Sequence, residues 1–153
     1  SVPLVPVAVR LVFADVCRSL PEDFPAQVHT DCDRDAVVLA DRPLLGDLVR
    51  NLVLNAANAG PKDGAVHLAC TRREGGWEIS VADIGCGMTA EELPRITEPF
   101  YMVDKSRARR AGGSGLGLSL CAEIARVHGS TLEFESEPGR GATVRLLLKE
   151  AQS

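Results

Sequence analysis

Four stretches of the chain alternate apolar and polar residues, and this alternation constrains the fold more than any other feature. They span residues 65–71, 77–82, 132–135 and 143–148. Because neighbouring side chains of a β-strand point to opposite faces, each stretch is predicted to bury one face and expose the other. A sheet built from such strands is covered on one side only. We therefore predict an α+β fold, a two-layer α/β sandwich whose mixed, mostly antiparallel sheet carries helices on one face.

Two helices are predicted to form the covering layer. The first spans 41–60, with Asp41 as N-cap, Pro43 in its first turn and Gly60-Pro61 at its end. The second spans Leu116–His128 and ends at Gly129. Before the first helix we predict a strand and then a helix within 7–20, followed by short strands at 26–30 and 36–40 around a polar turn at 31–35. After it we predict a hairpin turn at 75–76 and a short helix at 89–93. The segment 98–113 is predicted to be an irregular basic flap, which we expect to be mobile.

Composition limits the classes of function. The chain has 153 residues, 45% of them hydrophobic, which suits a single globular domain, and its net charge of −4 argues against nucleic-acid binding. Its five cysteines contain no CxxC pair, which favours a reducing compartment and argues against a zinc site. The start lacks both a signal-peptide pattern and Met, so we expect residues 1–153 to be one domain of a longer protein.

Three asparagines form a ridge on the first predicted helix. Asn51, Asn55 and Asn58 are spaced at i, i+4 and i+7, beside an apolar stripe, although Asn costs roughly 0.5–0.7 kcal/mol relative to Ala inside a helix. One interpretation is a solvated helix edge. The other is a polar ledge at a pocket, where amide oxygens ligate a hard cation such as Mg²⁺ and amide NH₂ groups donate to phosphate.

Two glycine motifs and a basic segment are further candidates. Asp83-Ile-Gly85-Cys-Gly87 follows a predicted strand and reads either as a plain turn or as a carboxylate beside a bare backbone that a flat ring can approach. The segment 112–118, GGSGLGL, runs into the second helix and is either a structural linker or an anion site. Lys105, Arg107, Arg109 and Arg110 belong to a solvated loop or to a lid over a polyphosphate.

In this order and spacing the motifs resemble the ATP-binding catalytic domain of sensor histidine kinases, within the superfamily of DNA gyrase, heat-shock chaperone and mismatch-repair ATPases. The resemblance covers 37–148 and includes residues 51–56 (NLVLNA), 83–87 (DIGCG), 95–101 (RITEPFY), 114–118 (SGLGL) and 139–143 (GRGAT). Its implied fold, a two-layer α/β sandwich with a mobile ATP lid, agrees with the one-sided sheet.

The resemblance implies ATP and Mg²⁺ as cofactors and assigns roles to individual residues. Asp83, with Gly85 and Gly87, would receive the adenine, Asn55 would ligate Mg²⁺, and Asn51 would line the phosphate site. Lys105 or Arg107 would meet the γ-phosphate. The backbone at 113–118 would cradle phosphates, and the full nucleotide set adds Asn58, Gly113, Ser114, Gly115, Leu116, Gly117, Leu118 and Thr143. Asn58 and Met102 stand where the family often has basic residues, so nucleotide affinity is expected to be modest.

The reaction predicted from this resemblance is phosphoryl transfer. Hydrolytic relatives typically carry Glu four residues before the Mg²⁺-ligating Asn, but here that position is Asn51, and an amide cannot act as a general base. None of the three histidines, His29, His67 and His128, has the sequence context of the family's acceptor histidine. His29 and His67 are predicted to face outward from strands, and His128 to end a helix, where the dipole favours its protonated form.

The predicted protein is thus the ATP-binding domain of a two-component sensor histidine kinase, acting on a histidine of a separate dimerisation domain and serving a response regulator. The fragment alone is expected to be monomeric, cytoplasmic and not autophosphorylating, without contact to nucleic acid or membrane. The sensed signal, the cognate regulator and any membrane anchoring of the parent stay open. The alternatives are a hydrolytic clamp-type ATPase, a serine kinase and a nucleotide sensor. The basic lid with Phe100-Tyr101 argues against the serine kinase.

Overall fold

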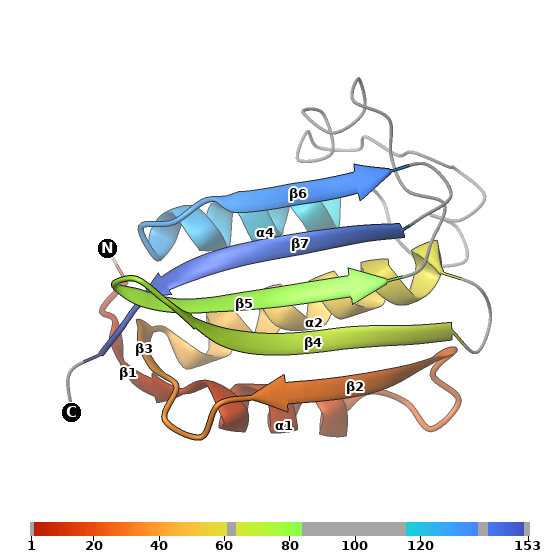
Figure 1. The fold of residues 1–153 in the computed structure, drawn as a ribbon, viewed down its shortest axis with the longest axis horizontal. Helices are drawn as coiled ribbons and strands as arrows, with labels where there is room; N and C mark the ends of the chain where they lie inside the picture. Colours follow the sequence, from red (N-terminus) through yellow and green to blue (C-terminus); the bar gives the residue numbers. More distant parts are fainter. Residues whose placement is uncertain (1, 61–63, 84–115, 138–140, 152–153) are drawn as a thin grey trace.

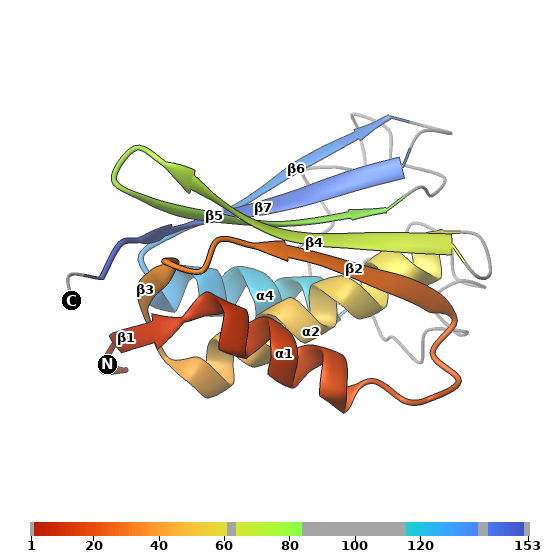
Figure 2. The same cartoon turned by 60° about the horizontal axis from the view of Figure 1, so that its bottom comes forward.

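A computed structural model describes residues 2–60, 64–83, 116–137 and 141–151. Within them the sheet contains five strands in the order β2-β4-β5-β7-β6: β2 (Ala26–Cys32), β4 (Gly64–Arg73), β5 (Gly76–Asp83), β7 (Gly141–Lys149) and β6 (Leu132–Glu137). Strands β2 and β4 run parallel, and the other neighbours run antiparallel. Figure 1 shows this sheet face-on, and Figure 2 shows the helices gathered against one side of it. The predicted two-layer, mostly antiparallel architecture is confirmed.

In the described part of the chain, three helices form the second layer: α1 (Val9–Ser19), α2 (Arg42–Ala59) and α4 (Leu116–Val127). The Asp41 side chain caps α2 by accepting a hydrogen bond from the Leu44 N–H over 2.9 Å, as its sequence position predicts. Gly129 ends α4 with a φ of +72°, in the left-handed conformation that favours glycine. The helical spacing in the sequence places Leu120 on one face with Cys121 and Ile124, but Leu120 is 48% exposed. The buried face of α4 consists of Cys121, Ile124 and Ala125.

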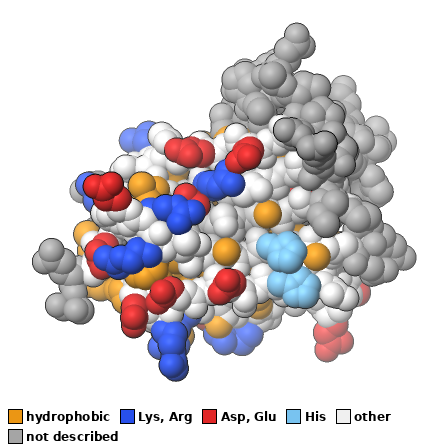
Figure 3. All heavy atoms as spheres, in the orientation of Figure 1, with side chains coloured by type: hydrophobic (Ala, Val, Ile, Leu, Met, Phe, Trp, Pro, Cys, Tyr) orange, Lys and Arg blue, Asp and Glu red, His pale blue; other side chains and the backbone are white. Residues whose placement is uncertain are grey.

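The core lies between the two layers. The alternating residues of β4, β5 and β7 bury the face predicted for them, with Leu68, Trp77, Ile79 and Leu146 fully enclosed. The opposite face of the sheet is open, and Figure 3 shows charged side chains of both signs spread over it. His29 and His67 stack there, with ring centroids 5.3 Å apart, and both are exposed as predicted.

The N-terminal strands belong to two different sheets. The turn is shorter than the predicted 31–35, because β2 extends to Cys32, and the Asp35 N–H donates to the Asp33 carboxylate over 2.8 Å. The strands on its two sides do not pair with each other. Instead β2 joins β4, while β3 (Val37–Ala40) pairs antiparallel with β1 (Val5–Ala8) in a separate two-stranded sheet. None of the helices in the described ranges is long and apolar enough to cross a bilayer.

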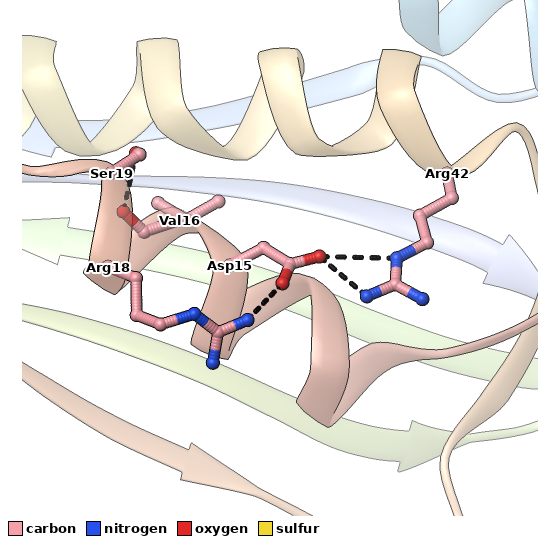
Figure 4. A network of polar contacts seen from close by, with 5 residues as sticks. All are labelled: Asp15, Val16, Arg18, Ser19 and Arg42. Carbon is pink, nitrogen blue, oxygen red and sulfur yellow. Dashed lines mark hydrogen bonds and ion pairs between the residues drawn. The ribbon is translucent and has the colours of Figure 1, made fainter.

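Helices α1 and α2 are joined at the surface by a carboxylate with two cationic partners. Arg42 Nε and Nη2 donate to Asp15 Oδ2 over 3.2 and 2.6 Å, and Arg18 donates to Asp15 Oδ1 (Figure 4). The hydrogen bond from Arg42 holds the pKa of the Asp15 carboxyl below its usual range. Since all three side chains are substantially exposed, this contact orients the helices more than it stabilises them.

The hairpin between β4 and β5 brings two glycines to its turn. Gly75 has a φ of +77°, which an L side chain rarely adopts. A Cβ atom at Gly76 would lie 2.1 Å from the Leu148 carbonyl oxygen of β7, so the close approach of the two strands requires glycine there. Glycine is therefore required at both residues of the predicted turn, by the backbone conformation at Gly75 and by the neighbouring backbone at Gly76.

Candidate functional site

The asparagine ridge lies on α2, where the three side chains are held differently. Asn51 Nδ2 donates to the Asp47 carbonyl over 2.8 Å, and Asn58 Nδ2 donates to the Leu54 carbonyl over 2.7 Å. These bonds to the preceding turn satisfy the amide donors and fix the side chains against the helix. Asn51 and Asn58 are half-buried, whereas Asn55 is exposed. The ridge is therefore ordered at both ends and accessible in the middle.

The first turn of α4 comes close to this ridge at Gly117. A Cβ atom placed on Gly117 would lie 3.8 Å from both Asn51 Oδ1 and Asn55 Nδ2. Two of the predicted site asparagines and one of the predicted site glycines therefore lie next to each other. The first turn of a helix carries N–H groups without intrahelical partners and the positive end of the dipole. Amide side chains and anion-attracting backbone are thus next to each other, as a phosphate site requires.

Two further predicted residues lie at the same end of the molecule. Asp83 is the last residue of β5 and is half-buried, with its Oδ1 atom shielded from solvent. Thr143 of β7 pairs with Ala82, so it lies one position away from Asp83 across the sheet. Figure 1 shows that the end of β5, the end of α2, the start of α4 and the start of β7 share one end of the fold. Asp83, at the end of β5, and the asparagine ridge of α2 therefore lie toward the same end of the fold.

The remaining predicted residues divide into two groups. Leu116 is the first residue of α4, and Leu118, partly buried, packs against the core, so the side chain of Leu118 is directed away from solvent. The others lie outside the described residues, as do the short helix at 89–93 and the flap at 98–113: Gly85, Gly87, Lys105, Arg107, Gly113, Ser114 and Gly115.

Sequence reasoning missed how α4 is positioned against α2. Cys121 Sγ donates to the Leu48 carbonyl over 3.7 Å, and burial raises the pKa of this thiol to about 12, so it keeps its proton. His128 is 5% exposed and accepts a hydrogen bond at Nε2 from the Asp41 N–H over 3.1 Å. Gly117, Cys121 and His128 follow at intervals of four and seven residues, a helical spacing that was visible in the sequence.

The side-chain chemistry of the described residues favours oxygen ligands for any metal. Within those residues no group of three or more His, Cys, Asp or Glu side chains is placed to hold a metal ion. Asn55, exposed beside the first turn of α4, offers an amide oxygen of the kind that hard cations accept. One such ligand suits Mg²⁺, which keeps several waters and takes further oxygens from bound phosphates.

A family model described as Histidine kinase-, DNA gyrase B-, and HSP90-like ATPase matches residues 40–152. The chain belongs to this ATPase family. The match includes every predicted site residue and begins next to the N-cap of α2. The predicted family is thereby confirmed, and Asn51, Asn55, Asp83 and Gly117 all lie within the matched residues.

Curated relatives of this ATPase domain are sensor histidine kinases. The chain is 39% identical over 122 residues to the sensor-like histidine kinase SenX3 of Mycobacterium tuberculosis, covering 80% of this chain and 30% of SenX3. It is 41% identical over 150 residues to the phosphate regulon sensor protein PhoR of Pseudomonas aeruginosa, covering 96% of this chain and 34% of PhoR. The chain spans about a third of the length of these relatives. It is an ATPase domain of the kind that sensor histidine kinases carry.

Solved structures agree on the fold. The mycobacterial sensor histidine kinase MprB aligns with a TM-score of 0.84 at 22% identity, covering 98% of this chain and 99% of that structure. Full-length ShkA, solved in complex with AMPPNP, aligns with a TM-score of 0.83 at 24% identity, covering all of this chain and 33% of ShkA. These likenesses support the two-layer architecture of the ATPase domain.

Proposed function

We propose that this chain binds Mg²⁺–ATP and positions its γ-phosphoryl group for transfer to a histidine on a separate helical dimerisation domain. The observation that carries the proposal is the contact of Asn51 and Asn55 with the first turn of α4 at Gly117. This contact joins amide ligands to helix N–H donors at the end of the fold where Asp83 lies. The sensor-kinase relatives support the choice of reaction.

Each residue has a defined part in this proposal. Asp83, at the carboxyl end of β5, accepts a hydrogen bond from the adenine amine, and its enclosed Oδ1 suits a buried polar contact. Asn55 ligates the magnesium ion, which when bound would neutralise charge on the phosphates. Asn51 holds its Oδ1 toward Gly117 because its Nδ2 is engaged by the Asp47 carbonyl. Gly85, Gly87, Lys105, Arg107 and the 113–118 backbone complete the proposed set, with Asn58 and Thr143 at its rim.

Phosphoryl transfer is favoured over hydrolysis by the chemistry of Asn51. A hydrolytic site needs a group that takes a proton from water, and a neutral amide whose NH₂ already donates to a carbonyl does not supply one. Transfer requires only positioning and charge neutralisation from this domain. In the full protein we propose that a response regulator receives the phosphoryl group from the acceptor histidine. The acceptor lies outside this chain in the proposal, so this chain alone should not label itself.

The test of nucleotide binding is a calorimetric titration with a non-hydrolysable ATP analogue, with and without Mg²⁺. We expect saturable binding that requires Mg²⁺, and at least a tenfold loss in Asn55→Ala, because a ligand to a charged group is removed. Arg50→Ala, an exposed change on the same helix, is the matched control and should bind normally. No heat of binding in the presence of Mg²⁺ would overturn the proposal.

Selectivity for the base tests Asp83 separately. Asp83→Asn should weaken an adenine nucleotide by about 10- to 100-fold, the range for a charge-assisted hydrogen bond, while barely changing the already weak binding of a guanine nucleotide. An equal loss for both bases would remove Asp83 from adenine recognition.

The reaction that the chain catalyses is tested by identifying where the transferred phosphate goes. Steady phosphate release by this chain, lost in Asn55→Ala, would identify a hydrolytic ATPase instead. With a helical acceptor domain added, a kinase labels a histidine, a serine kinase labels serine, and a nucleotide sensor labels neither.

A further inference from the structure

Two cysteines face each other across the edge of the sheet, away from the nucleotide site. Cys32 of β2 and Cys70 of β4 are Cα partners in the parallel register. Both are free thiols on the side of the sheet that packs against the helices. Cys70 is 5% exposed, and Cys32 is half-buried against the core. The pair therefore has one enclosed member and one that solvent reaches.

The spacing of neighbouring strands suits a bond between these residues. Adjacent strands lie about 4.7–4.9 Å apart, within the roughly 4.4–6.8 Å range of Cα separations in disulfides. Partners in a parallel register point to the same face of the sheet, so the two sulfur atoms lie on one side of it, and Cys32 Sγ donates to the Asp33 carbonyl over 3.4 Å. A bond between the two residues therefore needs no change in strand register.

The surroundings decide which sulfur reacts first. Burial raises the pKa of the Cys70 thiol far above its ordinary value, with Cys32 and Asp33 adding to the rise. Burial also raises the pKa of Cys32, with Asp33 and Asp31 adding to it and Cys70 and Arg10 opposing it. The more exposed Cys32 is therefore the first to ionise, and the reaction should accelerate as the pH rises.

We propose that Cys32 and Cys70 form a reversible intramolecular disulfide, a modification site separate from the nucleotide site. The oxidant is a low-molecular-weight disulfide such as oxidised glutathione. The Cys32 thiolate attacks one of its sulfurs, forming a mixed disulfide and releasing one thiolate. Cys70 then loses its proton and attacks the Cys32 sulfur, releasing the second. The protein dithiol loses two electrons, the small disulfide gains them, and the two thiol protons leave with the released thiols.

The bond would close a loop that contains α2 and its asparagine ridge. Residues 32 and 70 enclose β3, the whole of α2 and the first part of β4. The bond would also fasten β2, the edge strand, whose one strand partner among the described residues is β4. Because cross-links over long loops restrict the unfolded chain, the oxidised form should be the more stable one.

The experiment treats the reduced chain with oxidised glutathione at pH 8.5 and maps its peptides without reduction. We expect a Cys32–Cys70 linked peptide, no retained glutathione, and a rise in Tm of roughly 5 °C or more that dithiothreitol reverses. In Cys70→Ala, glutathione should stay on Cys32, and in Cys32→Ser the linked peptide should be absent.

A control variant carries Cys17→Ser, Cys86→Ser and Cys121→Ala, so that only the proposed pair remains. Its cross-link should form at the same rate as in the unaltered chain. Stable glutathione on Cys32 when Cys70 is present, or a cross-link that forms only after denaturation, would overturn the proposal.

Discussion

At the scale of single residues, His128 shows how tertiary contacts decide which hydrogen bonds a histidine ring makes. Its position just after α4 suggested a protonated imidazole favoured by the helix dipole. Its place at the end of α4 is confirmed, but the contacts are not those of a protonated ring, because Nε2 accepts from the Asp41 N–H while Nδ1 lies 2.8 Å from the Ile124 carbonyl. Only a neutral ring with its proton on Nδ1 can satisfy both partners. The residue therefore joins the end of α4 to the N-cap of α2.

Replacing His128 with Leu should lower the free energy of unfolding by about 1–3 kcal/mol. The change keeps an apolar body of similar size but leaves the part-buried Asp41 N–H without its acceptor. Urea unfolding followed by circular dichroism measures the loss. His67→Leu, at an exposed position on the open face, should change stability by no more than about 0.5 kcal/mol. Equal effects of the two substitutions would contradict the bridging role.

At the scale of elements, the pairing of α2 with α4 positions the candidate site. Contacts join the two helices along their length: His128 with Asp41 at one end, Cys121 with Leu48 in the middle, and Gly117 near Asn51 and Asn55 at the other. A Cβ atom at Gly117 would lie at an ordinary contact distance from both amides, so the space beside them admits a methyl group but not a long side chain.

Substitutions at Gly117 should separate helix stability from nucleotide binding. Gly117→Ala places its Cβ at an ordinary contact distance and should leave stability unchanged or raise it by up to about 1 kcal/mol, with binding largely kept. Gly117→Leu fills the space before Asn51 and Asn55 and should reduce affinity at least tenfold. Titration with the ATP analogue and thermal unfolding measure the two effects.

The matched control is Gly46→Leu on α2, where an added Cβ meets nothing within 4 Å. It should leave nucleotide affinity unchanged. If Gly117→Leu bound nucleotide as tightly as this control, the space beside the two asparagines would not be part of the site.

At the scale of the whole molecule, stability comes from one core between a sheet and a helix layer. Leu48 of α2 is fully buried in that core, whereas Leu147 of β7 lies on the open face and is 47% exposed. The same residue type thus occurs in both environments within one domain.

Leu48→Ala should cost about 2–5 kcal/mol, since it removes buried methyl groups and leaves a cavity. Leu147→Ala should cost less than about 1 kcal/mol, because its side chain is already half in water. Chemical denaturation of both variants tests this. A large loss for Leu147→Ala would indicate that the outer face is covered in solution.

Much of the fold was predictable from short stretches of sequence. The hairpin at Gly75-Gly76, the Asp41 cap and the buried faces of β4, β5 and β7 depend on residues close together in the chain, and all are confirmed. The site was predictable in part: the order of the motifs indicated the family, and Asn51, Asn55 and Gly117 do meet. The roles assigned to Lys105, Arg107 and the glycines at 85, 87, 113 and 115 stay predictions.

The sequence by itself determined which residues of each element face the core, because side-chain periodicity is a local property of strands and helices. Only the tertiary structure decided that β2 pairs with β4 and not with β3, that His128 reaches Asp41, and that Cys32 lies beside Cys70. These contacts join residues between 38 and 87 positions apart. Such pairings are chosen by how well distant surfaces pack once the layers assemble, and no local pattern encodes that choice.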